Sequence, residues 1–145
     1  MNFFDALRVS SSGLSAQRVR MNLAANNLAN INTTKTAEGG PYRRKMAVFA
    51  SKPLEKPFGD TLNSRMTGKL SEVQVVGIVD DPRPPYTKYD PQHLDADKNG
   101  YVEMPNINLM EEMTNMISAT RSYEANVTAI KASKDMALKA LEIGK

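Results

Sequence analysis

The stretch from Ile107 to Lys145 repeats apolar side chains at alternating intervals of four and three residues. A repeat averaging 3.5 residues is typical of a helix that packs along another helix in a coiled coil. Only Thr120 and Lys134 interrupt the line, which consists of Leu109, Met113, Met116, Thr120, Tyr123, Val127, Ile130, Lys134, Ala137 and Leu141. A helix of this length extends about 55 Å at ~1.5 Å per residue. We therefore expect it to need helical partners, within the chain or outside it.

A line of small residues runs beside this apolar line. It consists of Ala119, Asn126, Ser133 and Ala140. Small side chains allow two helix backbones to approach closely. We expect a second helix to lie near this side.

Residues 2–32 show a weaker version of the same repeat. Leu7, Leu14, Met21 and Leu28 are spaced by seven, and the complementary positions are Phe3, Ser10, Gln17, Ala24 and Ile31. Asn2 is suited to cap the helix start, with Asp5 in the first turn. Gly13 costs an isolated helix about 1 kcal/mol relative to Ala, and several asparagines weaken it further. This helix should depend on what it packs against.

The residues between the two helices show strand and turn patterns. Tyr42, Arg44, Met46 and Val48 alternate onto one face, which leaves Arg43 and Lys45 on a solvated face. The stretch 51–68 contains prolines and glycines and reads as a loop, whereas Leu70 to Val79 predicts a buried strand. Short strands are expected at Tyr86 to Tyr89 and Tyr101 to Met104, with a turn at Asn99-Gly100.

These patterns predict an α+β fold with two long terminal helices, paired as an antiparallel coiled coil, and a small β-rich module between them. The expected units are an N-terminal helix at 1–35, the module at 36–105 and a C-terminal helix at 106–145. Asn106 or Asn108 should cap the last helix, and Asn108 has the capping-box spacing to Glu111. A two-helix hairpin with polar interruptions buries too little apolar surface to be stable alone. We expect neighbouring copies to complete it.

The composition excludes several kinds of function. The net charge of +3 is spread along the chain, so no nucleic-acid footprint is expected. The chain has no cysteine and one histidine, His93, which predicts neither a metal site nor a catalytic triad. No apolar run is long enough to span a membrane, and the N-terminus lacks the features of a cleaved secretion signal. We expect no enzyme activity, no cofactor and no membrane insertion.

The segment from Asp95 to Gly100 matches the first half of an EF-hand calcium loop. However, the twelfth loop position is Asn106 rather than Glu, and no helix is expected before the loop. A tight turn that uses Asp97, Asn99 and Gly100 for their backbone preferences is the favoured interpretation. A calcium-binding module using Asp95, Asp97 and Asn99 remains an alternative.

Two stretches resemble a known family. Ser12-Gly13-Leu14, followed by the segment from Ala25 to Thr33, is similar to the N-terminal signature of the flagellar axial proteins, which form rod, hook and hook-associated structures. More specific are Gly40 to Lys45, the Asp95 to Val102 turn, Pro105 to Asn108 and the segment from Glu112 to Asn126. Together with the short length, they resemble the proximal rod proteins of the bacterial flagellar basal body.

The resemblance implies a structural subunit of the proximal rod, a hollow helical tube that transmits torque across the periplasm. It implies packing of the terminal helices in the tube wall, an outward-facing β module and uncleaved export through the flagellar type III apparatus. The implied partners are copies of itself, the rod proteins FlgB, FlgF and FlgG, the rod-base protein FliE and the MS ring. We expect the assembly contacts at Leu7, Leu14, Met21, Leu28, Asn27, Asn30, Met113, Met116, Tyr123, Asn126, Val127, Ile130 and Leu141. The alternative is a coiled-coil adaptor or secreted effector that binds a foreign partner.

Overall fold

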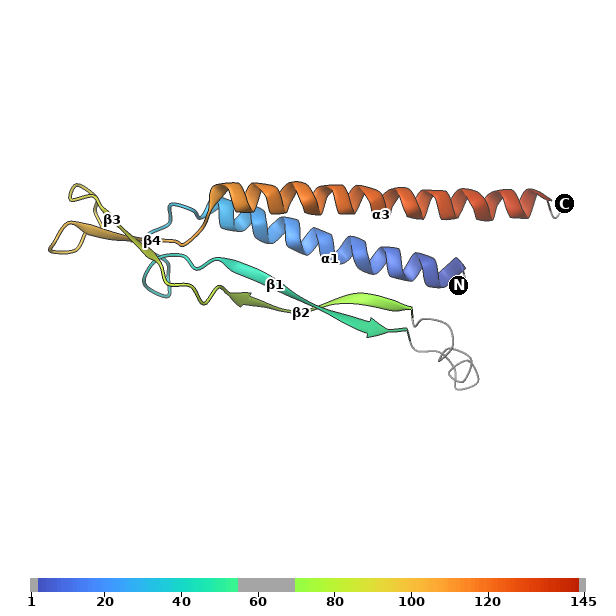
Figure 1. Cartoon of the computed structure of the whole chain (residues 1–145), viewed down its shortest axis with the longest axis horizontal. Helices are drawn as coiled ribbons and strands as arrows, with labels where there is room; N and C mark the ends of the chain where they lie inside the picture. Colours follow the sequence, from blue (N-terminus) through green and yellow to red (C-terminus); the bar gives the residue numbers. More distant parts are fainter. Residues whose placement is uncertain (1–2, 55–69, 144–145) are drawn as a thin grey trace.

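The computed structural model describes residues 3–54 and 70–143. Within these ranges the chain forms two long helices and two separate antiparallel hairpins (Figure 1). In chain order the elements are α1 (Phe3–Ala29), β1 (Lys45–Pro53), β2 (Ser71–Asp80), β3 (Tyr86–Tyr89), β4 (Tyr101–Met104) and α3 (Leu109–Ile143). The predicted α+β class, with helices at both ends and β structure between them, is confirmed.

The two helices lie side by side and run in opposite directions, so both chain ends lie at the same end of the molecule (Figure 1). α3 has 35 residues and α1 has 27. At ~1.5 Å per residue their lengths are about 52 and 40 Å. The antiparallel pairing follows from the sequence, whereas supercoiling of the pair remains a prediction.

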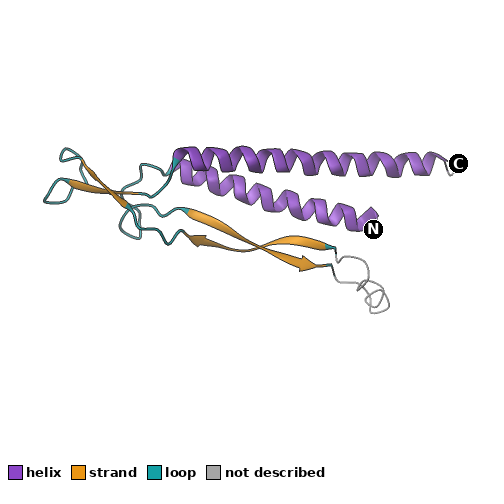
Figure 2. Ribbon diagram, viewed as in Figure 1, coloured by secondary structure: helices purple, strands orange, loops and turns teal. Residues whose placement is uncertain are grey.

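α1 is the central element of the molecule. It contacts α3 on one side and the β1–β2 hairpin on the other (Figure 2). The β3–β4 hairpin projects beyond the helices, at the end opposite the chain termini. The β structure is therefore divided, with one hairpin lying back along α1 and the other pointing away from it.

The long hairpin differs in detail from its prediction. β1 begins at Lys45 rather than Tyr42, and it continues through Pro53 into the expected loop at 51–68. The remainder of that loop, residues 55–69, lies outside the described residues. β2 was expected to be buried, but Val76 is 65% and Ile78 54% exposed. The expectation was wrong because a two-stranded sheet packed on one helix leaves much of its surface open.

The short hairpin forms as predicted. Tyr86 pairs with Met104 and Tyr89 with Tyr101. Asp97 Oδ1 accepts hydrogen bonds from the backbone N–H groups of Asn99 at 2.8 Å and Tyr101 at 2.9 Å. Gly100 has φ of +81°, a conformation that favours glycine. The residues that resembled a calcium loop thus build the turn.

Asn108 caps α3. Its Oδ1 accepts from the N–H of Met110 at 2.9 Å and of Glu111 at 3.3 Å. This satisfies two of the donors left free at a helix start and decides between the two candidate caps. The predicted cap of α1, Asn2, lies outside the described residues.

Candidate functional site

A buried arginine joins the helices to the long hairpin. Arg44, just before β1, is 9% exposed, and Glu112 in the first turn of α3 is 2% exposed. Arg44 Nε donates to Glu112 Oε1 at 2.7 Å, and its Nη2 lies 2.6 Å from the same oxygen. The Arg44 Nη groups also contact Glu111 at 3.0 Å and Asp81 at 3.4 Å. A buried charge is tolerated when it is paired and hydrogen-bonded, and Arg44 meets this condition through three carboxylates.

Asn27 of α1 completes this polar junction, which we define as Asn27, Arg44, Asp81 and Glu112. The Asn27 side chain is 1% exposed. Its Nδ2 donates to Lys45 O at 3.0 Å and to Glu112 Oε2 at 3.1 Å. Its Oδ1 accepts from Lys45 N at 2.9 Å and from Tyr42 Oη at 3.1 Å. One amide therefore connects α1, β1 and α3.

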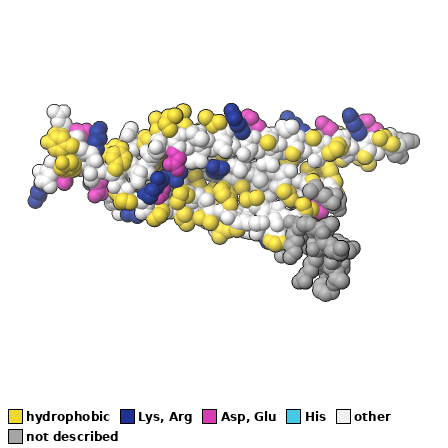
Figure 3. Space-filling model, viewed as in Figure 1, with side chains coloured by type: hydrophobic (Ala, Val, Ile, Leu, Met, Phe, Trp, Pro, Cys, Tyr) yellow, Lys and Arg dark blue, Asp and Glu magenta, His cyan; other side chains and the backbone are white. Residues whose placement is uncertain are grey.

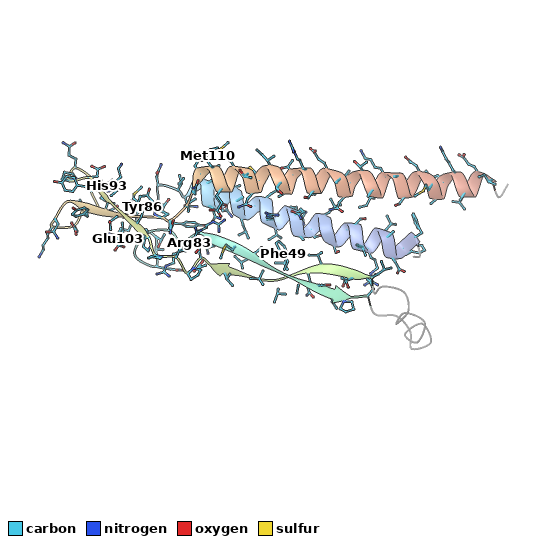
Figure 4. The ribbon with its side chains drawn as sticks, viewed as in Figure 1. Phe49, Arg83, Tyr86, His93, Glu103 and Met110 are labelled. Carbon is cyan, nitrogen blue, oxygen red and sulfur yellow. The ribbon has the colours of Figure 1, made fainter. Side chains whose placement is uncertain are left out.

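Asp81 follows β2 and is held by a second arginine. Arg83 Nη2 donates to Asp81 Oδ2 at 2.6 Å, and Arg83 Nε donates to Oδ1 at 3.0 Å. These hydrogen bonds hold the pKa of Asp81 at about 2, below its usual 3.8, against the opposing effect of burial. Asp81 in return raises the pKa of Arg83. Arg83 itself is half exposed and lies just beyond the end of β2, between the two hairpins (Figure 4).

Tyr42 lies near the carboxylates of Glu112 and Asp80. Burial, followed by the negative charges of Asp80 and Glu112, raises the pKa of the Tyr42 phenol. It therefore remains protonated at neutral pH and donates its O–H to Asn27. The junction is a structural contact in which Arg44, Asp81 and Glu112 are paired with one another or with neighbouring side chains.

The described residues contain no grouping of three or more His, Asp and Glu side chains suited to a metal ion. Within the same ranges, no helix combines the length and apolar content needed to cross a bilayer. At the predicted alternative site, Asp95 Oδ2 accepts from Thr34 Oγ1 at 2.7 Å, and Asp97 Oδ1 holds the turn. Both carboxylates are engaged in contacts within the chain.

The face of α3 that contacts α1 is not centred where the sequence pattern placed it. Glu112 and Ala119 are buried, and Asn126 and Ser133 continue this line at intervals of seven with partial burial. Met116, Tyr123, Ile130 and Ala137 lie beside them and are also partly covered. The line of small residues, where a second helix was expected to approach, is therefore the centre of the contact. Met113 and Leu141, predicted in the main line, are 43% and 70% exposed.

Close approach of the helices explains Gly13. A Cβ atom at this position would lie 3.0 Å from Asn126 Nδ2 of α3. Nearby, Thr120 Oγ1 lies 3.4 Å from Met21 Sδ. Three of the predicted assembly residues, Met21, Asn27 and Asn126, thus make contacts within the chain. Tyr123, Val127 and Ile130 are half-buried, and their part in assembly stays a prediction.

α1 is covered on two sides, by α3 and by the β1–β2 hairpin, and the heptad repeat in its sequence identified only the side toward α3. Leu7, Leu14, Met21 and Leu28 are half-buried on the side that Met21 shares with α3. The most buried residues of α1, however, are Ala16, Leu23, Ala24 and Asn27. Asn27 contacts the start of β1, and Ala16 and Leu23 are on the same side by helical spacing. Asn30 bonds the Asn26 carbonyl at 2.9 Å and so closes the helix end.

Large apolar side chains remain exposed on α3 and on the hairpin (Figure 3). On α3 they gather at its two ends, as Leu109, Met110, Met113 and Ile117, then Met136, Leu138, Leu141 and Ile143. The two clusters are separated by a stretch that exposes Arg121, Glu124 and Lys131. By helical spacing the first group lies on one side of α3, and exposed apolar surface of this kind marks a protein contact.

Sequence reasoning missed Arg44 and Glu112. The strand alternation correctly separated exposed Arg43 and Lys45 from the covered face that carries Tyr42 and Arg44. A charged side chain on a face shared with Tyr42, Met46 and Val48 was the available signal of a buried ion pair. Its acidic partner is distant in sequence, so no local spacing indicated it.

Two families match the ends of the chain. Residues 7–35 match the family described as flagella basal body rod protein. Residues 98–143 match the family described as flagellar basal body rod FlgEFG protein C-terminal. These ranges contain most of α1 and all of α3, so both matches fall on the helical pair and the segments next to it.

Curated relatives match the chain over its whole length. A flagellar basal-body rod protein FlgC of Borreliella burgdorferi is 45% identical and covers 99% of this chain and 98% of the relative. Its counterpart in Bacillus subtilis is 47% identical over 100% of both chains. That of Salmonella typhimurium is 38% identical over 99% of this chain and 97% of the relative.

Proposed function

Since this chain belongs to the family of flagellar basal-body rod proteins FlgC, and is thereby a structural subunit of the flagellar rod in the basal body, we propose how it builds that rod. The terminal helices of neighbouring subunits pack together into the wall of a hollow helical tube. Contacts between different surfaces of identical copies generate such a tube because they do not close into a small ring. Torque passes from subunit to subunit through these helices.

The exposed apolar ends of α3 carry this proposal. Among the helices and strands that the structure describes, α3 packs against α1 alone, and it leaves Met110 at 69%, Met136 at 65% and Leu141 at 70% exposed. Burying one such side chain is worth roughly 1.5–3 kcal/mol. Association with neighbouring subunits removes these side chains from water, and this gain drives assembly.

The polar junction supplies the stiffness that a load-bearing subunit needs. It ties α1, the start of β1, the end of β2 and the start of α3 at one place. A force that acts on the hairpins reaches the helices through Arg44 and Asn27 rather than through a flexible linker. The β3–β4 hairpin, which projects from this end, is positioned to contact a neighbouring rod component.

The place of the chain in the flagellar rod indicates which other proteins it contacts. We infer contacts with copies of this chain and with the rod proteins FlgB, FlgF and FlgG, with the rod-base protein FliE at the inner end and the MS ring beside it. Delivery is by the flagellar type III export apparatus without cleavage of the chain. Membership of the rod family supports these assignments.

Complementation tests the proposal. The chain is produced in a strain that lacks its own FlgC, and swarming and the yield of isolated rods are measured. We expect the unmodified chain to restore both and Leu141→Asp to abolish both, because a charge would be buried between subunits. Thr128→Asp, on the polar outer side of α3, is the control and should be tolerated. Full motility with Leu141→Asp would contradict the proposed interface.

A second measurement addresses the folding of the ends. The far-ultraviolet circular dichroism of the isolated chain should show less helix than its two long helices represent. The helical signal should rise when other rod proteins are added. A foreign-partner adaptor predicts no response to rod proteins, so this result separates the two functions.

A further inference from the structure

The β1–β2 hairpin is held on α1 by two polar side chains, one near each end of the hairpin. Near the junction, the amide of Asn27 bonds both the N–H and the C=O of Lys45. Near the other end, Ser12 Oγ accepts from the N–H of Val73 at 3.1 Å. Ser12 donates its own hydrogen to Val9 O at 2.8 Å, which orients the hydroxyl lone pairs away from the α1 backbone.

The two contacts lie on opposite edges of the hairpin. In an antiparallel pair, the N–H and C=O of one residue point to the same side of its strand. The Lys45 groups point away from β2, and the Val73 N–H points away from β1, because both are bonded to α1 instead of the partner strand. The strong twist of a two-stranded ribbon makes this possible, and the strands visibly cross in Figure 2.

The distance between Ser12 and Asn27 equals the distance between their two contact points on the hairpin only if α1 is helical. Ser12 and Asn27 are 15 residues apart, which spans about 22 Å in a helix at ~1.5 Å per residue. Asp80 is paired with Lys45 and Ser51 with Val73, so the contacts are 7 residues apart along β2 and 6 along β1, with a register shift between Val48 and Phe49. These lengths span about 20–23 Å in strands at ~3.3 Å per residue. The same 15 residues in an extended chain would span roughly 50 Å.

We infer that Ser12 and Asn27 are positioning residues that fix the β1–β2 hairpin to α1, so that the hairpin takes its place only when α1 is helical. The inference concerns a single chain and goes beyond the rod contacts proposed above. Close to the contact of Ser12 with Val73, Arg8 of α1 forms an ion pair with Glu72 of β2 at 3.4 Å, which also holds β2 near α1. Because Arg8 is 56% exposed, this pair contributes little by itself.

Amide hydrogen exchange of the full chain tests the inference, residue by residue. It is measured on the isolated chain and on the chain mixed with other rod proteins. Ser12→Ala should accelerate exchange of the Val73 amide by about tenfold or more, since its bonding partner is lost, and leave the Lys45 amide slow. Asn27→Ala should accelerate exchange of the Lys45 amide. Ser12→Thr, which keeps the hydroxyl, should restore protection of Val73.

Ser11→Ala and Asn26→Ala are the matched controls, because both side chains are exposed and adjacent to the positioning residues. They should change neither amide. In every sample, Val73 and Lys45 should be protected only where the amides of α1 are protected too. Protection of Val73 without a protected α1, fast exchange of both amides beside a protected α1, or no difference between Ser12→Ala and Ser11→Ala would overturn the inference. Fast exchange in α1, Val73 and Lys45 of every sample would overturn it as well, because no helical α1 would then exist to hold the hairpin.

Discussion

Arg44 and Glu112 are 68 positions apart in the chain, yet their side chains form a buried ion pair in which Arg44 Nε donates to Glu112 Oε1 at 2.7 Å. The contact brings the segment before β1 onto the first turn of α3. Its energetic role follows from burial rather than from attraction alone. Removing one partner leaves a desolvated charge, whereas removing both removes that charge as well, and Asp81 keeps its pairing with Arg83.

Arg44→Met should therefore lower the free energy of unfolding by about 3–5 kcal/mol. The double variant Arg44→Met/Glu112→Met should recover a large part of this loss. Chemical denaturation followed by circular dichroism measures both, with rod proteins present if folding requires them. Arg43→Met, an exposed neighbour, should change stability by less than ~0.5 kcal/mol. A double variant as unstable as the single one would contradict this account.

The sequence was sufficient to predict the helices and not the junction. Residues 107–145 show a repeat that few other structures produce, and the turn around Asn99-Gly100 is determined by local backbone preferences. The junction joins Asn27, Arg44, Asp81 and Glu112, which come from four separate segments. No local pattern relates these residues, so their proximity appears only when the chain is folded.

The contact face of α3 is centred on the line of small residues and not on the main apolar line beside it. The pattern favoured the largest apolar residues, such as Leu109 and Met113. In the structure, Ala119 is fully buried and Gly13 lies against Asn126, so the two helices approach closely along this line. The bulkier residues consequently lie at the flank, where a neighbouring subunit can reach them. Similarly, α1 has two covered sides, and a single heptad repeat describes only one.

Acid should weaken the junction through Asp81. The pKa of its carboxyl is about 2 in the folded chain against a usual 3.8, so the folded state favours the ionised form. Its contribution to stability is complete above pH 3.8 and is lost as the pH falls through about 2. The difference in unfolding free energy between the parent and Asp81→Asn should shrink over this range.

Urea unfolding between about pH 5 and pH 2 measures this dependence. Asp80→Asn, which changes an exposed neighbour, serves as the control and should follow the parent curve closely. A difference between the parent and Asp81→Asn that is independent of pH would show that Asp81 acts only through its shape.

Gly13→Ala should have a small net effect because two contributions oppose each other. Alanine favours the helix by up to about 1 kcal/mol, but its Cβ would lie 3.0 Å from Asn126 Nδ2. The double variant Gly13→Ala/Asn126→Ala removes the clash and should be more stable than the sum of the single changes predicts. A double-mutant cycle by thermal unfolding measures the coupling. Additive effects would place Asn126 further from Gly13 than the structure does.

Gln17→Leu tests whether polar residues of the helical repeats set the register between subunits. Gln17 Oε1 is buried and has no hydrogen-bond partner among residues 3–54 and 70–143. Such a group costs about 1–3 kcal/mol, so leucine should stabilise the helices while permitting misaligned pairing. Rod yield and swarming should fall even as thermal stability rises. Lys134→Leu, at an exposed position, should act in the same direction on rod yield. Unaltered motility and yield would count against the register role.

Calcium should not bind to the turn at residues 95–100. Asp97 already accepts two backbone hydrogen bonds and Asp95 accepts one from Thr34. Calorimetric titration with calcium should therefore give no heat beyond dilution. Asp97→Ala should instead destabilise the hairpin by roughly 1 kcal/mol per lost hydrogen bond, which thermal unfolding detects. Saturable heat abolished by Asp97→Ala would restore the calcium interpretation.

The matched spacing of Ser12 and Asn27 against the hairpin limits how this chain can change in length. One residue inserted between them would turn Asn27 by about 100° around α1 and shift it by ~1.5 Å, away from the Lys45 backbone. Deletion of one residue would turn it by the same angle in the opposite sense. Segment 12–27 should therefore accept substitutions far more readily than insertions or deletions.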